Sequence, residues 1–187
     1  RWRARLDHEL KPYLRAGFDA TEPLLLDCLR LAMYQIRFLD RIPTHAAVHT
    51  AVELARNRRS QGQGRFVNGV LRAWLRGEEN PLPNDAIQAL AIEESHPLWL
   101  VRRWVKEYGL QEARARAQAN NRMAPLTIRA QGDAPDRATL VERLEAEEAK
   151  VAEGRWAPDA LCIVSHPRPF AGTSFKAGWW TVQDEAS

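Results

Sequence analysis

The sequence predicts a mainly α-helical protein that ends in a small α+β module. Apolar residues recur at helical spacing through most of the first 120 residues. After residue 122 the pattern changes to short apolar runs on either side of one helical segment. Two prolines between residues 78 and 85 separate two groups of helices. We therefore expect a helical domain over residues 1–77, linking helices over 78–122 and the module over 123–187.

The first helices are predicted from apolar stripes and their ends. Leu6, Leu10 and Leu14 form a short stripe that stops near Gly17. Thr21 is placed to cap the next helix, with a proline in its first turn. Residues 24–39 are apolar almost all round, which is typical of a central core helix.

Two further helices complete the expected helical domain. Thr44 is placed to cap a helix whose apolar face runs from Val48 to Ala55. Residues 60–64, Ser-Gln-Gly-Gln-Gly, are expected to form a loop. Apolar residues then repeat at helical spacing from Phe66 up to Gly77.

The second half contains shorter elements. Residues 87–92 predict a short helix, Ser95 is placed to cap another, and Gly109 is placed to end it before a helix over 111–120. The module is then predicted, by residue ranges, as a strand over 125–130, a helix over 136–151, a strand over 160–165, an irregular stretch that opens with residues 167–172, and a last strand over 180–183.

Charge is distributed unevenly along a chain that carries +3 overall. Residues 1–76 hold fourteen Lys and Arg against seven Asp and Glu, a net charge of +7, whereas residues 77–187 carry −4. A hydrophobic content of 45% excludes a disordered chain. No apolar run has the ~20 residues that a membrane span needs. Two distant cysteines do not make a disulfide framework, so a cytoplasmic location is expected.

Arginines cluster where acidic residues are absent. The stretch from residue 54 to 76 has no Asp or Glu. Such a cluster is the electrostatic footprint of RNA binding, because a guanidinium group offers a planar donor fork to phosphate. A solvated helix face is the alternative. The candidate RNA-binding residues are Arg56, Arg58, Arg59, Arg65, Arg72 and Arg76.

Other candidate sites have a simpler structural interpretation. Cys28 and Cys162 lie in apolar segments and are expected to be small buried hydrophobic residues. His45 and His49 share a helix face, but no third metal ligand accompanies them, so no metal site is predicted. Gly62 and Gly64 precede a helix without the spacing of a phosphate loop.

Aromatic and acidic side chains are likewise assigned to packing. Trp74, Trp99 and Trp104 are expected in the core, since they fall at or beside apolar helix positions. Trp179 and Trp180, together with the pair Asp184 and Glu185, are expected to contact a further domain.

Several runs in order carry a resemblance. They are Leu31-Ala-Met-Tyr-Gln-Ile-Arg-Phe-Leu-Asp-Arg-Ile-Pro43, residues 45–56, Arg65-Phe-Val-Asn-Gly-Val-Leu-Arg72, Ser95-His-Pro-Leu-Trp-Leu-Val-Arg-Arg-Trp104, Ala119-Asn-Asn121 before residues 126–129, and Val182-Gln-Asp-Glu-Ala-Ser187. Together they resemble the bacterial 16S rRNA cytosine-C5 methyltransferases of the Sun/Fmu (RsmB) type. The early runs are similar to the NusB-like RNA-binding domain, and the later ones to the small module that precedes the catalytic domain.

The resemblance implies an enzyme that uses S-adenosylmethionine and attacks cytosine C6 with a cysteine thiolate. The S-adenosylmethionine domain and the Pro-Cys motifs of that family have no counterpart in these 187 residues. The chain is therefore expected to be an N-terminal part of a longer protein, with no catalytic residue and no cofactor of its own. Its expected partners are 16S rRNA, or a precursor of the small ribosomal subunit, and its own catalytic domain. A NusB-like antitermination or protein-docking module without methyltransferase activity is the alternative.

Overall fold

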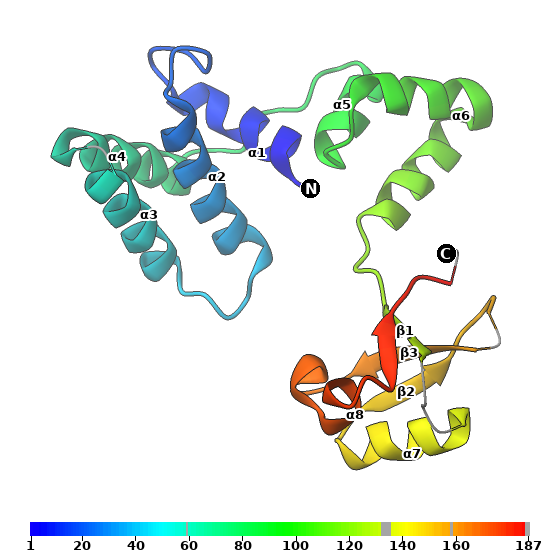
Figure 1. Cartoon of the computed structure of the whole chain (residues 1–187). Coiled ribbons are helices and arrows are strands. Elements are labelled where there is room, and N and C mark those ends of the chain that lie inside the picture. Colours follow the sequence, from blue (N-terminus) through cyan, green and yellow to red (C-terminus); the bar gives the residue numbers. More distant parts are fainter. Residues whose placement is uncertain (59, 132–135, 158, 186–187) are drawn as a thin grey trace. The chain divides into compact units, whose positions relative to one another are not determined.

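A computed structural model describes residues 1–58, 60–131, 136–157 and 159–185. The chain divides into two compact units, Arg1–Arg122 and Met123–Ser187. The first is helical and the second is built on a four-stranded sheet (Figure 1). The predicted mainly α fold with a small α+β module is confirmed. No helix within the described ranges is long and apolar enough to cross a membrane.

The first unit has two hydrophobic cores. The first core joins α1 (Arg3–Leu10), α2 (Pro23–Phe38), α3 (Thr44–Arg58) and α4 (Gln61–Arg76), with the short 3-10 helix η1 (Lys11–Tyr13) after α1. The second core joins α5 (Ala86–Glu93) and α6 (Leu98–Asn120). Helix α2 is central, as its apolar sequence predicts, and its Leu29 and Met33 are fully buried.

Three predicted caps are wrong. The Thr21 hydroxyl donates to the Gly17 carbonyl at 2.9 Å, so it closes a turn and Glu22 occupies the cap position of α2. Thr44 is the first residue of α3. Ser95 caps a different helix from the expected one, because its hydroxyl accepts from the backbone N–H of Ala4 in α1 at 2.8 Å. Helix α6 begins after Pro97 instead.

The predicted glycine loop before α4 is also wrong, because the glycines belong to the first turns of the helix. Ser60 is the N-cap and accepts from the Gln63 backbone N–H. Gly64 is buried against α3, and a Cβ placed on it would lie 3.2 Å from the Arg56 Cβ and 3.3 Å from the Val52 carbonyl oxygen. The glycine therefore permits a close approach of the two helix backbones.

This contact gives a matched pair of substitutions. Gly64→Leu is expected to destabilise the first unit by about 1–3 kcal/mol, because a large side chain would force α3 and α4 apart. Gly69→Leu lies on the same helix but meets nothing within 4 Å, so the better helix propensity of leucine should leave stability equal or higher. Chemical denaturation of the two variants checks this difference, and equal stability would contradict the close approach.

Gly109 divides α6 into two helical stretches, as the sequence predicts. Its φ of 80° is a backbone conformation that other residues rarely adopt, and it interrupts the helical geometry within α6. The bend brings Ala113 and Ala117 of the second stretch into the same core as Leu90 of α5 and Val101 of the first stretch. The predicted helix break is therefore confirmed.

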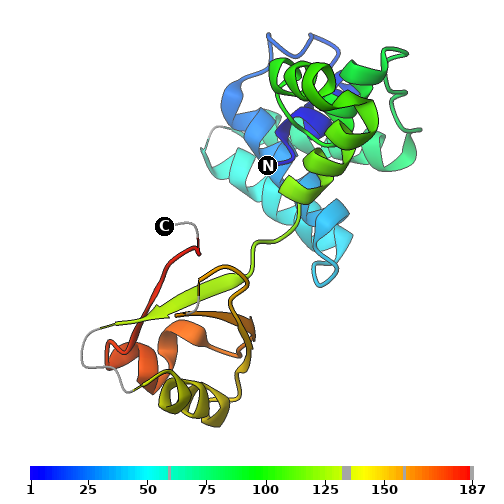
Figure 2. The ribbon, with the colours of Figure 1, turned by 90° about the vertical axis from the view of Figure 1, so that its right-hand side faces the viewer.

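The second unit is an antiparallel sheet covered on one face by helices (Figure 2). Its elements are β1 (Leu126–Ala130), α7 (Arg137–Ala146), β2 (Lys150–Glu153), β3 (Ala160–Ser165), η2 (Pro169–Ala171), α8 (Thr173–Lys176) and β4 (Trp180–Val182). The strand order is β2-β3-β1-β4. Ile128 on β1, Leu140 and Leu144 on α7, and Trp180 on β4 meet in one core.

Two expectations for this unit fail. The predicted helix over 136–151 ends at Ala146, and Val151 lies in β2. Glu148 explains the difference, since its φ of 65° turns the chain out of the helix. The stretch predicted to be irregular contains η2 and α8.

Glu147 joins α7 to α8 through a partly buried hydrogen-bond network. Its carboxylate accepts from the Thr173 hydroxyl at 2.6 Å, and from the Ser174 backbone N–H at 2.9 Å and hydroxyl at 3.0 Å. The Trp180 indole N–H in turn donates to the Ser174 hydroxyl at 3.0 Å. Burial raises the pKa of Glu147, but the hydrogen bonds from Thr173 and Ser174 together outweigh it and lower the pKa.

This lowered pKa predicts a pH dependence. A carboxyl group whose pKa is lower in the folded state stabilises the fold above its ordinary pKa of about 4.5, and loses this effect as pH falls through the folded pKa. The free energy of unfolding of the second unit should therefore be flat near neutrality and decline in acid. Glu147→Gln should lower it by about 1–3 kcal/mol at neutral pH and weaken the acid-dependent decline. Denaturation of both proteins across this pH range tests the assignment.

Candidate RNA interface

An arginine stripe runs along the exposed side of α4. Arg65, Arg72 and Arg76 are separated by seven and four residues, so they share one helix face and span about 16 Å along the axis. All three side chains are exposed, while Val67 and Leu71 on the same helix are fully buried in the first core. Folding therefore turns the predicted sequence cluster into a continuous cationic face.

Two of the remaining candidate arginines lie at the end of α3. Arg56 and Arg58 are exposed in its last turn, and Arg56 lies beside Gly64 at the start of α4. Arg56 is not free of acidic neighbours, as its Nη2 contacts Glu53 Oε2 at 2.7 Å, just outside the acid-free stretch. Arg59 lies outside the described residues.

Ion pairing distinguishes the stripe from Arg30 and Arg37 of the same unit. Arg30 and Arg37 bind carboxylates of α1 at 2.6 Å and 3.0 Å. Within the part of the chain that the structure describes, Arg58, Arg65 and Arg72 form no ion pair, and Arg76 Nε donates to the Arg72 backbone carbonyl. These guanidinium groups remain available to phosphate.

Two cavities of the first unit differ in charge. A cavity of about 430 Å³ beside the stripe is lined by Arg15 and Arg65 together with apolar and neutral residues, and no carboxylate is among its described lining residues. The second, of about 360 Å³, is lined by Glu9, Glu78 and Glu79 against the single cation Arg37. Phosphate is therefore favoured at the first cavity and disfavoured at the second.

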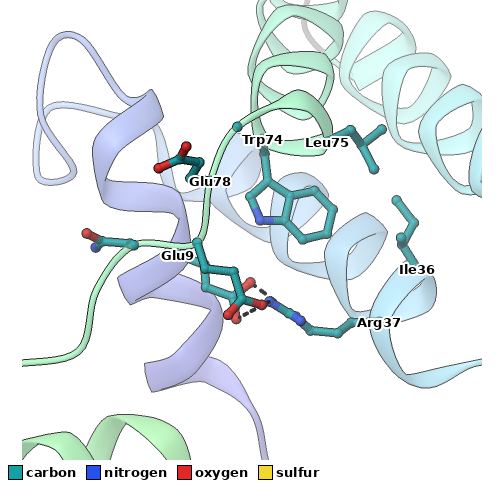
Figure 3. Close-up of a pocket in the computed structure, with 9 residues that line it drawn as sticks. Glu9, Ile36, Arg37, Trp74, Leu75 and Glu78 are labelled. Atoms are coloured by element: carbon teal, nitrogen blue, oxygen red, sulfur yellow. Dashed lines mark hydrogen bonds and ion pairs between the residues drawn. The ribbon is translucent and has the colours of Figure 1, made fainter.

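The second cavity is held by a charge network that joins three segments (Figure 3). The Arg37 side chain points toward the Glu9 carboxylate there, and Trp74 and Ile36 line the same cavity. Arg37 Nη2 lies 3.0 Å from Glu9 Oε1 and 2.9 Å from Glu79 Oε1. This network ties α1 and α2 to the segment after α4, which gives it a structural role.

The cysteines and two of the tryptophans lie in packing environments, whereas the histidines and Trp99 are exposed. Cys28 is buried and Cys162 is partly buried. His45 and His49 are exposed, and the described residues contain no group of three or more possible metal ligands. Trp74 and Trp104 pack against cores, but Trp99 is 65% exposed, so its predicted core position is wrong.

Three of the four residues expected to face a further domain make contacts within the second unit. Trp180 is 2% exposed inside its core, and Trp179 packs against the same core. Glu185 accepts from the backbone N–H groups of Trp156 at 2.8 Å and Ala157 at 3.2 Å. These residues carry no signal of this packing in the sequence, because it depends on the pairing of β4 with β1.

Two families of known protein domains match this chain. Residues 1–76 match the NusB family, and residues 96–169 match the ferredoxin-like domain of RsmF/B-like methyltransferases. The second match includes α6, which packs with the first unit.

Curated relatives share nearly the whole chain. The chain is 37% identical to the probable ribosomal RNA small subunit methyltransferase B of Bacillus subtilis, over 97% of this chain and 41% of the relative. It is 30% identical to the probable enzyme of that name from Synechocystis, over 88% and 38%, and 32% identical to the one from Vibrio cholerae, over 84% and 36%. It thus spans about two fifths of the length of these relatives.

A solved structure supports the fold. That of PH0851 superimposes with a TM-score of 0.75 at 18% identity, over 98% of this chain and 42% of that one. The sequence matches carry the family assignment, since both domains and their order agree. The chain belongs to the family of the ribosomal RNA small subunit methyltransferase B proteins, of which it carries the NusB domain and the ferredoxin-like domain.

Proposed function

We propose that this chain is the RNA-recognition region of an S-adenosylmethionine-dependent 16S rRNA cytosine-C5 methyltransferase, and that the α4 arginine stripe binds and positions the rRNA. The observation that carries the proposal is this stripe, an exposed cationic face on a NusB-family domain. Phosphate contacts from such a face supply affinity and orientation, while unpaired bases supply sequence specificity.

The described residues do not fit S-adenosylmethionine. Nucleotide cofactors in α/β proteins bind at the carboxyl ends of parallel strands, where the strand order reverses. The sheet here pairs β1, β2, β3 and β4 antiparallel throughout. No step of methyl transfer is therefore assigned to these residues.

Cys28 is also unsuited to the attack on cytosine. The side chain of Cys28 is 1% exposed, and burial, followed by the nearby Asp27 carboxylate, raises the pKa of its thiol. A catalytic cysteine needs the opposite environment, one that favours the thiolate. We therefore assign catalysis to the part of the enzyme that the longer relatives have in addition to this region.

Loss of the gene tests the whole proposal. Mass spectrometry of 16S rRNA from cells without the gene should show one 5-methylcytidine fewer. The intact gene should restore it, and a gene that encodes glutamate at positions 65, 72 and 76 should restore it poorly. Unchanged methylation would contradict the enzyme assignment and favour an antitermination or docking module. Full restoration by the altered gene would contradict the role of the stripe.

A further inference from the structure

A second exposed face combines an aromatic ring with cations. Trp99, Arg102, Arg103 and Lys106 lie at spacings of three, four and seven residues on the first stretch of α6. This spacing gathers them on one side of the helix. All four side chains are exposed, and Trp99 is 65% exposed. We call this surface the α6 face.

Trp99 is not held by the core beneath the helix. Val101 is fully buried there, and Trp104 and Val105 pack against the same core from the first stretch of α6. Within the described residues, the side chain of Trp99 has no ring contact, hydrogen bond or ion pair. A large ring left free in this way contributes little to the fold and is available to a ligand.

The charge around the ring is positive. Arg103 Nε donates to Glu107 Oε1 at 2.9 Å, which neutralises this one cation. Arg102 and Lys106 form no ion pair within the part of the chain that the structure describes. A free ring beside two free cations is complementary to a ligand that has both a flat face and negative charge.

We propose that the α6 face is a second RNA-contact surface that takes an unpaired nucleotide. The base stacks on the Trp99 indole, and Arg102 and Lys106 bind the flanking phosphates. The nucleotide must be unpaired, because a base within a duplex is stacked between its neighbours and cannot offer its face to a side chain. The inference rests on the proposed function in taking RNA as the partner, but it concerns different residues from those of the α4 stripe.

Affinity for unpaired and duplex RNA separates stacking from charge. The 187-residue chain is titrated with an unpaired RNA oligonucleotide and with a duplex of the same length. Trp99→Ala should weaken binding of the unpaired RNA about five- to 100-fold, the range measured when a stacking aromatic residue is removed. Binding of the duplex should change little. Trp99→Phe should retain much of the affinity, since it keeps a ring.

Trp156→Ala is the matched control, because Trp156 is 75% exposed, lies in the other unit and carries the Arg155 guanidinium 4.6 Å from its ring. It should leave the affinity for both RNAs unchanged. A 2-aminopurine base in the unpaired RNA adds a second readout, as its fluorescence should be quenched by the chain and much less by Trp99→Ala. Circular dichroism should show that the Trp99 variants are folded.

The outcomes separate this inference from the proposed function. Unchanged affinity of Trp99→Ala for unpaired RNA would overturn the inference, while loss of binding on glutamate substitution of the α4 stripe would still support the proposed function. Absence of any RNA binding by the unaltered chain would overturn both. Unchanged RNA affinity with weaker binding to the remainder of the enzyme would identify the α6 face as a protein interface and overturn the inference.

Discussion

Replacement of Arg65, Arg72 and Arg76 by glutamate is expected to weaken binding of 16S rRNA by roughly 100-fold or more. The three guanidinium groups share one exposed face of α4, and no acidic residue lies on this helix. Their reversal would put three negative charges where phosphates bind. The fold should survive, because these side chains lie outside the core and glutamate is about as good a helix former as arginine. Equilibrium binding at fixed ionic strength measures the change.

A second triple variant controls for net charge. Lys150, Arg155 and Lys176 are exposed in the second unit, and their replacement by glutamate changes the net charge by the same amount. This variant should lose much less affinity than the α4 variant. Equal losses would show that RNA responds to the overall charge of the chain and would contradict a localised interface.

Trp180→Ala is expected to destabilise the second unit by about 3–5 kcal/mol, the cost of deleting a large buried aromatic side chain. Trp180 is 2% exposed, and its ring centroid lies 4.8 Å from that of Phe175. The substitution also removes the indole N–H that donates to the Ser174 hydroxyl. Because a 65-residue unit has little stability to spare, this loss should unfold much of it. Chemical denaturation, followed by the far-ultraviolet signal of the sheet, measures the effect.

Trp156→Ala serves as the control for this substitution too. Its side chain is 75% exposed, so the free energy of unfolding should change by no more than about 0.5 kcal/mol. Trp180→Phe should fall between the two, because it keeps a ring and loses the hydrogen bond. Similar stability of Trp180→Ala and Trp156→Ala would contradict the placement of Trp180 in the core.

The sequence predicts the elements of this fold well where apolar periodicity dominates. The largely apolar α2, the apolar face of α4 and the break at Gly109 follow from local pattern alone. The loop predicted around Gly62 and Gly64 is wrong, because a glycine-rich composition ordinarily marks a loop but does not exclude a helix. Here Gly64 is required by the close packing of α3 on α4, which is a tertiary contact that no local window contains.

In the candidate site, too, some features follow from the local sequence and others depend on tertiary contacts. The spacing of Arg65, Arg72 and Arg76 is enough to predict a shared helix face, since helical geometry is local. The exposure of Trp99 and the burial of Trp180 are not predictable in this way. Both tryptophans lie in apolar segments, and which of them is buried depends on the elements that pack against each helix or strand.

Salt dependence of rRNA binding tests the central account most directly. The logarithm of the binding constant is measured against the logarithm of salt concentration for the unaltered chain and for a variant with glutamine at positions 65, 72 and 76. Each phosphate contact to unpaired RNA contributes about 0.7 to the slope, so loss of three contacts should reduce the slope by about 2. A variant with the same slope and affinity as the unaltered chain would contradict the proposal that the α4 stripe binds rRNA.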